Sequence, residues 1–206
     1  MIRTEYKGSE WLFPFVAYTP EKIEGTLPLV VQLHGAGERG DGDLDKMDII
    51  GFSHLLKERD YNAIVVMPQC PADQFWVART ESVIKFIEDI KEHFAVDSSR
   101  VSLCGISMGG FGTWYTAMFK PQLFSAIAPC CGGGMPWNAR VLDMPVYAIH
   151  GTADSVVNVL YTDEMVNALK GLSRQVIYKR VEGVGHNSWD YTFDSELFEW
   201  LISKKR

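Results

Sequence analysis

A serine stands in the glycine-rich segment Gly105-Ile106-Ser107-Met108-Gly109-Gly110, directly after the apolar run of residues 101–104. A serine hydroxyl is a weak nucleophile at neutral pH, so it requires a general base nearby and a tight turn that exposes its oxygen. Gly105 and Gly109 permit such a turn, because a Cβ at either position would crowd the bend from a strand into a helix. The pattern therefore predicts that Ser107 is a nucleophile.

Two later segments provide an acid and a base for this serine. Asp154 ends the segment His150-Gly151-Thr152-Ala153-Asp154, and His186 lies in Gly183-Val184-Gly185-His186-Asn187. Each follows a predicted strand, at residues 145–150 and 175–181. The order serine, acid, histidine is one of the chain orders of a catalytic triad. We therefore expect the three side chains to meet at the carboxyl edge of a parallel sheet.

Other residues compete for these roles. A serine in a glycine-rich turn can be structural, and a loop histidine can simply satisfy local hydrogen bonds. Asp143 and Asp190 compete with Asp154, but Asp143 precedes its strand and Asp190 follows His186 too closely along the chain. The remaining histidines are weaker candidates for the base, two at strand ends beside glycines and two on helix-like segments: His34, His150, His54 and His93.

Short apolar runs alternate with amphipathic segments along the chain, which predicts an α/β fold with a mostly parallel central sheet. Apolar residues recur at helical spacing over residues 83–94, 165–172 and 197–201. We find no repeat or linker and expect a single domain over residues 1–206. The predicted strands are residues 13–18, 29–33, 63–67, 101–104, 125–128, 146–150 and 175–181.

Composition excludes several classes of function. The chain has 206 residues, 26 acidic against 20 basic, and a formal net charge of −6, so nucleic acid is not expected as a partner. No run approaches the roughly 18 apolar residues of a membrane span, and the first ten residues lack a signal-peptide core. We therefore expect no membrane association and a cytoplasmic protein, or a secreted one if a leader has been removed. The four cysteines have no metal-ligand spacing and are expected to be reduced.

Taken together, five segments resemble α/β-hydrolases, and most closely compact carboxylesterases of the phospholipase/carboxylesterase and feruloyl-esterase-like group: residues 33–40, 68–71, 105–110, 150–154 and 185–186. The resemblance implies an α/β-hydrolase fold with helices on both faces of the sheet. The short segment of residues 131–145 leaves no room for a large lid domain. Within this superfamily the frame supports many chemistries, so the resemblance is less specific for the substrate.

The resemblance also implies a role for each site residue. Ser107 attacks an ester carbonyl, His186 takes its proton, and Asp154 holds and stabilises the histidine. The backbone N–H groups of Ala36 and Met108 form the oxyanion hole. Neither a metal nor an organic cofactor is required. With His186 as the base, the rate is expected to rise with pH around a midpoint of about 6–7.

Aromatic residues near these segments indicate the substrate. Phe75, Trp76, Trp137 and Trp189 are predicted to line a cleft, where aromatic faces suit phenolic acyl groups or sugar rings. The hypothesis is a neutral or aromatic (feruloyl or cinnamoyl) or carbohydrate-linked carboxylic ester, small or attached to a polysaccharide. A serine peptidase, a lysophospholipase or thioesterase, and a noncatalytic binding protein of the same fold remain as alternatives, and the oligomeric state stays open.

A dinucleotide-binding function is a further alternative. Residues 35–40 match the pattern GxGxxG after a strand, with Asp60 about 20 residues further on. That fingerprint needs a helix whose N-terminus faces the pyrophosphate. Here four aspartates follow the glycines and would repel phosphate, which disfavours this function: Asp41, Asp43, Asp45 and Asp48.

Overall fold

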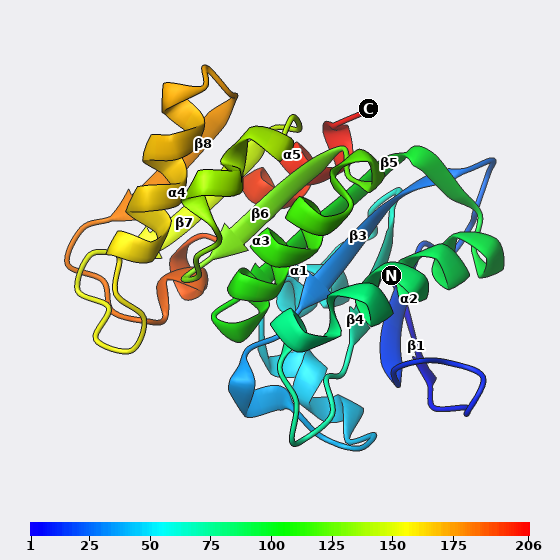
Figure 1. Ribbon diagram of the computed structural model, residues 1–206. Helices are drawn as coiled ribbons and strands as arrows, with labels where there is room; N and C mark the ends of the chain where they lie inside the picture. The colour runs from blue at the N-terminus through cyan, green and yellow to red at the C-terminus, as the bar shows by residue number, and fades with distance from the viewer.

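Eight strands form one sheet in the computed structural model, which describes residues 1–206 (Figure 1). The strands are β1 (Ile2–Tyr6), β2 (Phe15–Thr19), β3 (Leu27–Leu33), β4 (Ile64–Pro68), β5 (Val96–Ile106), β6 (Ala126–Cys130), β7 (Val146–Gly151) and β8 (Val176–Val181). Their order across the sheet is β1-β2-β4-β3-β5-β6-β7-β8. The pairs β1–β2 and β2–β4 are antiparallel, and all the others are parallel. The predicted mostly parallel α/β fold is confirmed.

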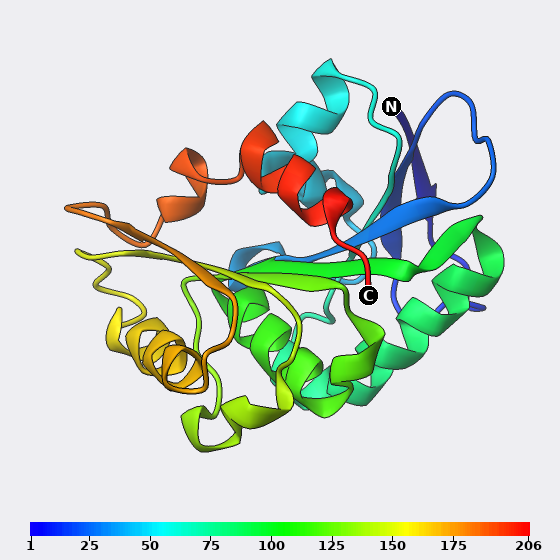
Figure 2. The same ribbon diagram turned by 90° about the horizontal axis from the view of Figure 1, so that it is seen from above.

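Helices cover both faces of this sheet. They are α1 (Ser53–Glu58), α2 (Thr80–His93), α3 (Met108–Phe119), α4 (Leu160–Gly171) and α5 (Ser195–Ser203). Figure 2 shows α1 and α5 on one face and α2, α3 and α4 on the other. None of these helices combines the length and the apolar character that crossing a membrane would require.

The central strands are apolar without interruption because both of their faces are covered. Along β3, Leu29, Val31 and Leu33 pack on the side of α2 and α3, whereas Val30 packs on the side of α1 and α5. Successive side chains of a strand point to opposite faces, so each face receives its own hydrophobic core.

The first strand was not predicted from the sequence. β1 has the sequence IRTEY, is partly exposed and lies at the edge of the sheet. Arg3 and Glu5 form an ion pair of 2.8 Å, and Arg3 also reaches Asp48 at 2.9 Å. An edge strand with charged residues lacks the apolar run that identifies a buried strand.

Four loops meet at the carboxyl edge of the parallel strands. They follow β3, β5, β7 and β8, which lie close together in the sheet. The connection from β6 to β7 is limited to residues 131–145 and contains one short 3₁₀ helix, η5 (Pro136–Val141). The expectation that no large lid is inserted there is confirmed. This sheet edge is therefore where the predicted site residues must be sought.

Candidate active site

Ser107 lies in a sharp turn between β5 and α3, with φ of 55° and ψ of −113°. A positive φ is strained for a non-glycine residue, and the turn is held by a hydrogen bond from the Ser107 N–H to the Cys130 carbonyl oxygen at 2.9 Å. A Cβ at Gly105 would lie 2.2 Å from the Gly109 carbonyl oxygen, and one at Gly109 would lie 2.0 Å from the Leu33 carbonyl oxygen. Glycine is therefore required at both positions, as the sequence predicts.

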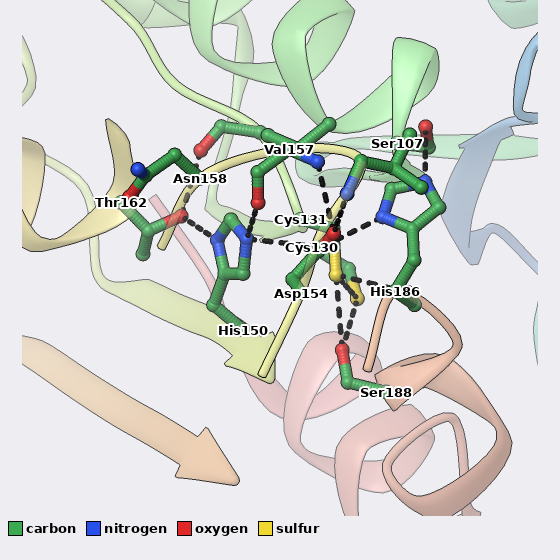
Figure 3. Close-up of polar contacts among 12 residues, drawn as sticks. Ser107, Cys130, Cys131, His150, Asp154, Val157, Asn158, Thr162, His186 and Ser188 are labelled. Atoms are coloured by element: carbon green, nitrogen blue, oxygen red, sulfur yellow. Dashed lines mark hydrogen bonds and ion pairs between the residues drawn. The ribbon is translucent and has the colours of Figure 1, made fainter. Parts of the chain in front are cut away.

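The structure brings Ser107, His186 and Asp154 together (Figure 3). The Ser107 Oγ lies 2.8 Å from His186 Nε2, and His186 Nδ1 lies 2.7 Å from Asp154 Oδ2. An ionised carboxylate only accepts hydrogen bonds, so the proton of the neutral ring is on Nδ1 and Nε2 accepts from the serine hydroxyl. This is the tautomer that a general base for the serine requires.

Neither competing aspartate is placed to hold this histidine. Asp143 pairs with Arg206 at 2.8 Å, and Asp190 accepts a hydrogen bond from the Asn187 side chain at 2.9 Å. Neither carboxylate forms a hydrogen bond or an ion pair with His186. Among the acids that the sequence offered, only Asp154 contacts the histidine.

The Asp154 carboxylate is buried and accepts several hydrogen bonds. Its Oδ1 accepts from the backbone N–H groups of Val156 and Val157 at 2.8 and 2.9 Å, and its side chain has no exposed surface. Burial alone would raise the pKa of Asp154, but the hydrogen bonds from His186 and from these backbone groups lower it below its ordinary value. Asp154 is therefore an anion at neutral pH.

The surroundings of the His186 ring raise its pKa above the ordinary value. Its contact with the Cys131 side chain and its pairing with Asp154 raise the pKa of His186, although burial acts in the opposite direction. The Cys131 Sγ lies 3.3 Å from the His186 backbone oxygen, beneath the loop that carries the histidine. A ring that gains a proton readily at this position suits the transfer of a proton away from the serine.

A second histidine, which the sequence offers only as a weaker candidate for the base, contacts the same carboxylate. His150 Nε2 lies 3.2 Å from Asp154 Oδ2 and 2.9 Å from the Val157 carbonyl oxygen, and its side chain is completely buried. Both neighbours are acceptors, so Nε2 carries a proton and donates. On the other side of the ring, Nδ1 lies 2.7 Å from the Thr162 hydroxyl. The signal in the sequence is the spacing of His150 and Asp154 at the end of β7.

The two residues predicted to form the oxyanion hole border the same pocket as the serine. This pocket has a volume of about 380 Å³ and is lined by Ala36, Phe75, Val77, Ser107, Met108, Phe111 and Tyr115. Ala36 begins the short 3₁₀ helix η1 (Ala36–Glu38), and Met108 begins α3. The first N–H groups of a helix have no acceptor within the helix, so both are available to a ligand.

His34 fixes the loop that carries Ala36. Its Nε2 accepts a hydrogen bond from the Cys70 N–H at 2.9 Å, so Nδ1 carries the proton and donates to the Gly35 oxygen at 2.6 Å. Burial lowers the pKa of His34 to about 4, so the ring is neutral at pH 7. A neutral ring can donate and accept at the same time, as this arrangement requires.

The prediction that Trp76 lines the cleft is wrong. Its side chain has no exposed surface, lies edge-on to Phe13 at 5.5 Å, and donates from Nε1 to the His34 carbonyl oxygen at 3.0 Å. A tryptophan offers a large apolar surface with one donor, and here both are used inside the protein. Trp76 therefore supports the loop of His34 from within the core.

The other two tryptophans lie at different distances from the serine pocket. Trp137 is 79% exposed on η5 and is not among the residues that line this pocket. Trp189 packs edge-on against the His186 ring at 5.1 Å. The aromatic side chains that do line the pocket are Phe75, Phe111 and Tyr115.

Phe111 and Tyr115 were missed by the sequence analysis, although a signal for them exists. They lie four and eight positions after Ser107 on α3, so they share the face of the helix that begins at the serine. An aromatic residue at such spacing after a nucleophile is placed beside the reacting atoms. Their position follows from helix geometry once α3 is known to begin at Met108.

The geometry disfavours the dinucleotide-binding alternative. The glycines of residues 35–40 lead into η1, which has three residues, and not into an α-helix. A group of potential metal ligands lies elsewhere, where donor atoms of Cys131, His150 and Asp154 are within 4.8 Å of one another. Each of these atoms already takes part in a hydrogen bond or ion pair within the protein, so we assign the group to holding the histidine loops.

Comparison with known proteins identifies the family to which this chain belongs. The model of the phospholipase/carboxylesterase family matches residues 67–196. Among curated proteins, a bifunctional acetylxylan esterase/xylanase of Neocallimastix patriciarum is 26% identical over 146 residues, covering 68% of this chain and 21% of the relative. A poly(3-hydroxyalkanoate) depolymerase C of Paucimonas lemoignei is 28% identical over 134 residues, covering 56% of this chain and 30% of the relative. The chain thus spans less than a third of these two relatives.

Solved structures give the same fold over the whole chain. A thermostable esterase superposes with a TM-score of 0.83 at 28% identity, covering 100% of this chain and 63% of the other. The feruloyl esterase module from Clostridium thermocellum, complexed with sinapinate, superposes with a TM-score of 0.71 at 14% identity, covering 98% and 87%. Since the family model matches well over half of the residues, the chain belongs to the phospholipase/carboxylesterase family of α/β-hydrolases.

Proposed function

We propose that this protein is a serine carboxylesterase that forms an acyl-enzyme on Ser107. One observation carries the proposal, namely the continuous set of hydrogen bonds from the Ser107 hydroxyl through His186 to Asp154, at 2.8 and 2.7 Å. A structural serine in a glycine-rich turn would not need a strained backbone, a base in the correct tautomer and a buried acid behind it.

In the first half of the reaction, the Ser107 Oγ attacks the carbonyl carbon of the ester while its proton passes to His186 Nε2. The imidazolium that forms is stabilised by the Asp154 carboxylate. The carbonyl oxygen becomes an oxyanion and accepts hydrogen bonds from the N–H groups of Ala36 and Met108, which border the same pocket. His186 then donates the proton to the alcohol oxygen, the carbon–oxygen bond breaks, and the alcohol leaves.

In the second half, water replaces the alcohol. His186 Nε2 takes a proton from this water as its oxygen attacks the acyl carbon. The second oxyanion is held by the same two N–H groups. When it collapses, His186 returns the proton to Ser107 Oγ and the carboxylic acid is released. The residues of this chain supply every proton acceptor and donor that the sequence of steps needs.

The shape and composition of the serine pocket support an ester with an apolar or aromatic group beside the carbonyl. Three aromatic residues line a pocket of about 380 Å³, and Val77, Met108 and the small side chain of Ala36 complete its walls around Ser107. Ring faces and edges of this kind pack well against a phenyl ring. The names of similar proteins, an acetylxylan esterase and a feruloyl esterase, also favour esters of aromatic or small acids on carbohydrates.

Hydrolysis of a panel of p-nitrophenyl esters and methyl hydroxycinnamates by the native protein and by Ser107→Ala tests this proposal. We expect turnover by the native protein and its loss in the variant, with circular dichroism to verify that the variant is folded. A fluorophosphonate probe should label native Ser107. Turnover that persists in Ser107→Ala would overturn the proposal. Failure of both turnover and labelling would favour a noncatalytic binding protein, and cleavage of acylated peptides in place of esters would favour a peptidase.

A further inference from the structure

A second cavity adjoins the pocket of Ser107. It has a volume of about 570 Å³ and shares Val77 and Tyr115 with the serine pocket. Its walls are formed by the end of the 3₁₀ helix η3 (Trp76–Arg79), the start of α2, the last turns of α3 and the start of η5. The lining residues differ in character from those of the serine pocket, because several of them are polar or charged: Arg79, Thr80, Glu81, Ser82 and Asn138. A substrate that fills both cavities would meet an apolar region first and a polar region beyond it.

Arg79 has no polar partner within the protein. Its guanidinium lies over the Phe13 ring, with Cζ 5.6 Å from the ring centroid, and its Nε is buried without a hydrogen-bond partner. Arg3 and Arg206, in contrast, each hold carboxylates at 2.8 to 2.9 Å. A guanidinium above an aromatic ring interacts with the ring face through its charge, and this contact uses none of its N–H groups as hydrogen-bond donors to an acceptor atom. The two terminal nitrogens of Arg79 are not buried and have no acceptor in the protein, so they are available to a group in the cavity that this residue lines.

The other groups around the cavity determine which ligand this arginine can take. Glu81 is the one carboxylate that lines the cavity, it is exposed, and it forms no ion pair with Arg79. Thr80 donates its hydroxyl proton to the Val77 carbonyl oxygen at 3.1 Å, whereas Ser82 and Asn138 are free to donate. A single cation beside one carboxylate, in a protein with a net charge of −6, suits a singly charged anion better than a phosphate dianion.

We infer that this second cavity binds a carboxylate group carried by the ester substrate and that Arg79 is the residue that selects it. The inference rests on the proposed esterase function, because the two cavities share a wall beside Ser107. A carboxylate accepts two parallel hydrogen bonds from the edge of a guanidinium, which gives both attraction and orientation. Arg79 is thus a specificity-determining residue that takes no part in the bond-breaking steps.

Pairs of esters that differ only in charge test the inference. In one arm, p-nitrophenyl esters of increasing acyl length end either in a carboxylate or in the carboxamide of the same length. In the other arm, acetate esters of hydroxy acids are compared with those of the matching hydroxy amides, and acid release is followed in a pH-stat. The arms decide whether the charged group belongs to the acyl or to the alcohol part. For one arm we expect a preference for the carboxylate of about tenfold in kcat/KM at low salt, weakened in 0.5 M NaCl.

Three variants connect this preference to its cause. In Arg79→Met, which keeps an apolar stem over Phe13, the ratio of carboxylate to carboxamide turnover should fall to about one. Arg79→Lys keeps the charge but loses the planar edge, and it should retain part of the preference. Glu81→Gln removes the neighbouring negative charge and should raise the ratio about twofold. Thermal melting verifies that each variant is folded.

The outcomes separate this inference from the proposed function. Neutral esters that are hydrolysed without any preference for the carboxylate in either arm would overturn the inference and leave the esterase intact. A preference that survives in Arg79→Met would overturn it as well. If no ester of either charge is hydrolysed and Ser107 does not react with a fluorophosphonate, the esterase function itself fails, and the inference fails with it.

Discussion

Two regions border the cleft: the carboxyl edge of the sheet, and a helical wall formed by Phe75, η3 and the start of α2. They differ in how completely their polar groups are hydrogen bonded within the protein. At the edge, Ser107, His186, Asp154 and His34 are all hydrogen bonded to one another or to the backbone. In this wall, Arg79 has no hydrogen-bond or ion-pair partner in the protein, and Phe75 is half-exposed. Polar groups that are already held in place can stabilise a transition state without rearranging. Polar groups that have no partner in the protein can bind a polar group of a ligand. Changes at the edge should therefore lower kcat, and changes on the wall should alter KM and substrate preference.

The largest loss of kcat is expected from substitution of the residues proposed to carry out the reaction at the sheet edge. Ser107→Ala removes the attacking hydroxyl and should lower kcat by about 10⁴- to 10⁶-fold. Asp154→Asn no longer holds His186 in the tautomer that accepts the serine proton and should lower kcat by about 10⁴-fold. Steady-state kinetics on p-nitrophenyl acetate measure both. The double variant should be little worse than Ser107→Ala alone, since the residues act as a unit. A double variant whose losses multiply would show that the two do not work together.

A smaller loss of kcat is expected from substitution of His34, which supports the loop of the proposed oxyanion hole. His34→Ala removes the ring that links Gly35 to Cys70 and frees the loop of Ala36, so kcat should fall about 10²-fold with little change in KM. His34→Asn can still donate to the Gly35 oxygen and should lose less. Equal losses in the two variants would mean that the Gly35 hydrogen bond does not position the loop.

A still smaller loss of kcat is expected from substitution of His150, which contacts the Asp154 carboxylate. His150→Leu removes the donor that contacts Asp154 and Val157, and kcat should fall about tenfold. His150→Gln places an N–H near the position of Nε2 and should recover most of the activity. The readout that separates positioning from folding is the split between kcat and KM, with thermal melting as the control. A fall in Tm without a fall in kcat would assign His150 to stability alone.

On the wall, the predicted change is in substrate preference. Phe75→Ala should lower kcat/KM for methyl hydroxycinnamates about 2- to 10-fold relative to a small aliphatic ester, since an aromatic contact contributes about 0.5–1.5 kcal/mol. Trp137→Ala is the matched control, because this indole does not line the pocket. If Trp137→Ala alone weakens aromatic esters, the substrate lies over η5 and not against Phe75.

The smallest expected effect is a displacement along the pH axis. The reaction needs neutral His186, so kcat/KM should rise with pH through the pKa of this ring. Because contacts with Cys131 and Asp154 raise that pKa, the midpoint should lie above the ordinary value of about 6.5. Cys131→Ser should move it downward. A midpoint below 6.5 in the native protein would show that burial dominates at His186.

The sequence predicted the edge far better than the wall, and the reason is physical. Ser107, Asp154 and His186 each follow a strand that the sequence pattern predicts, and their order along the chain is that of a catalytic triad. These two features predict that the three side chains lie together. The wall depends on how helices pack, and nothing in the sequence says that Trp76 turns inward while Phe75 beside it turns outward. The strand β1 was missed because its charged residues lie at an edge of the sheet and break the apolar pattern.

The glycines of the turn that carries Ser107 also bear on how such a protein can diverge in evolution. A Cβ at Gly109 would meet the Leu33 backbone at 2.0 Å, and one at Gly110 would meet the Cys130 backbone at 2.2 Å. The turn therefore packs against the ends of β3 and β6 at once, and almost no substitution of these glycines is tolerated. In the helical wall, Trp76 is fixed in the core, but the exposed side chains of Val77 and Glu81 are under no such constraint. New substrate ranges can accumulate at such exposed positions across generations while the position of Ser107 is inherited unchanged.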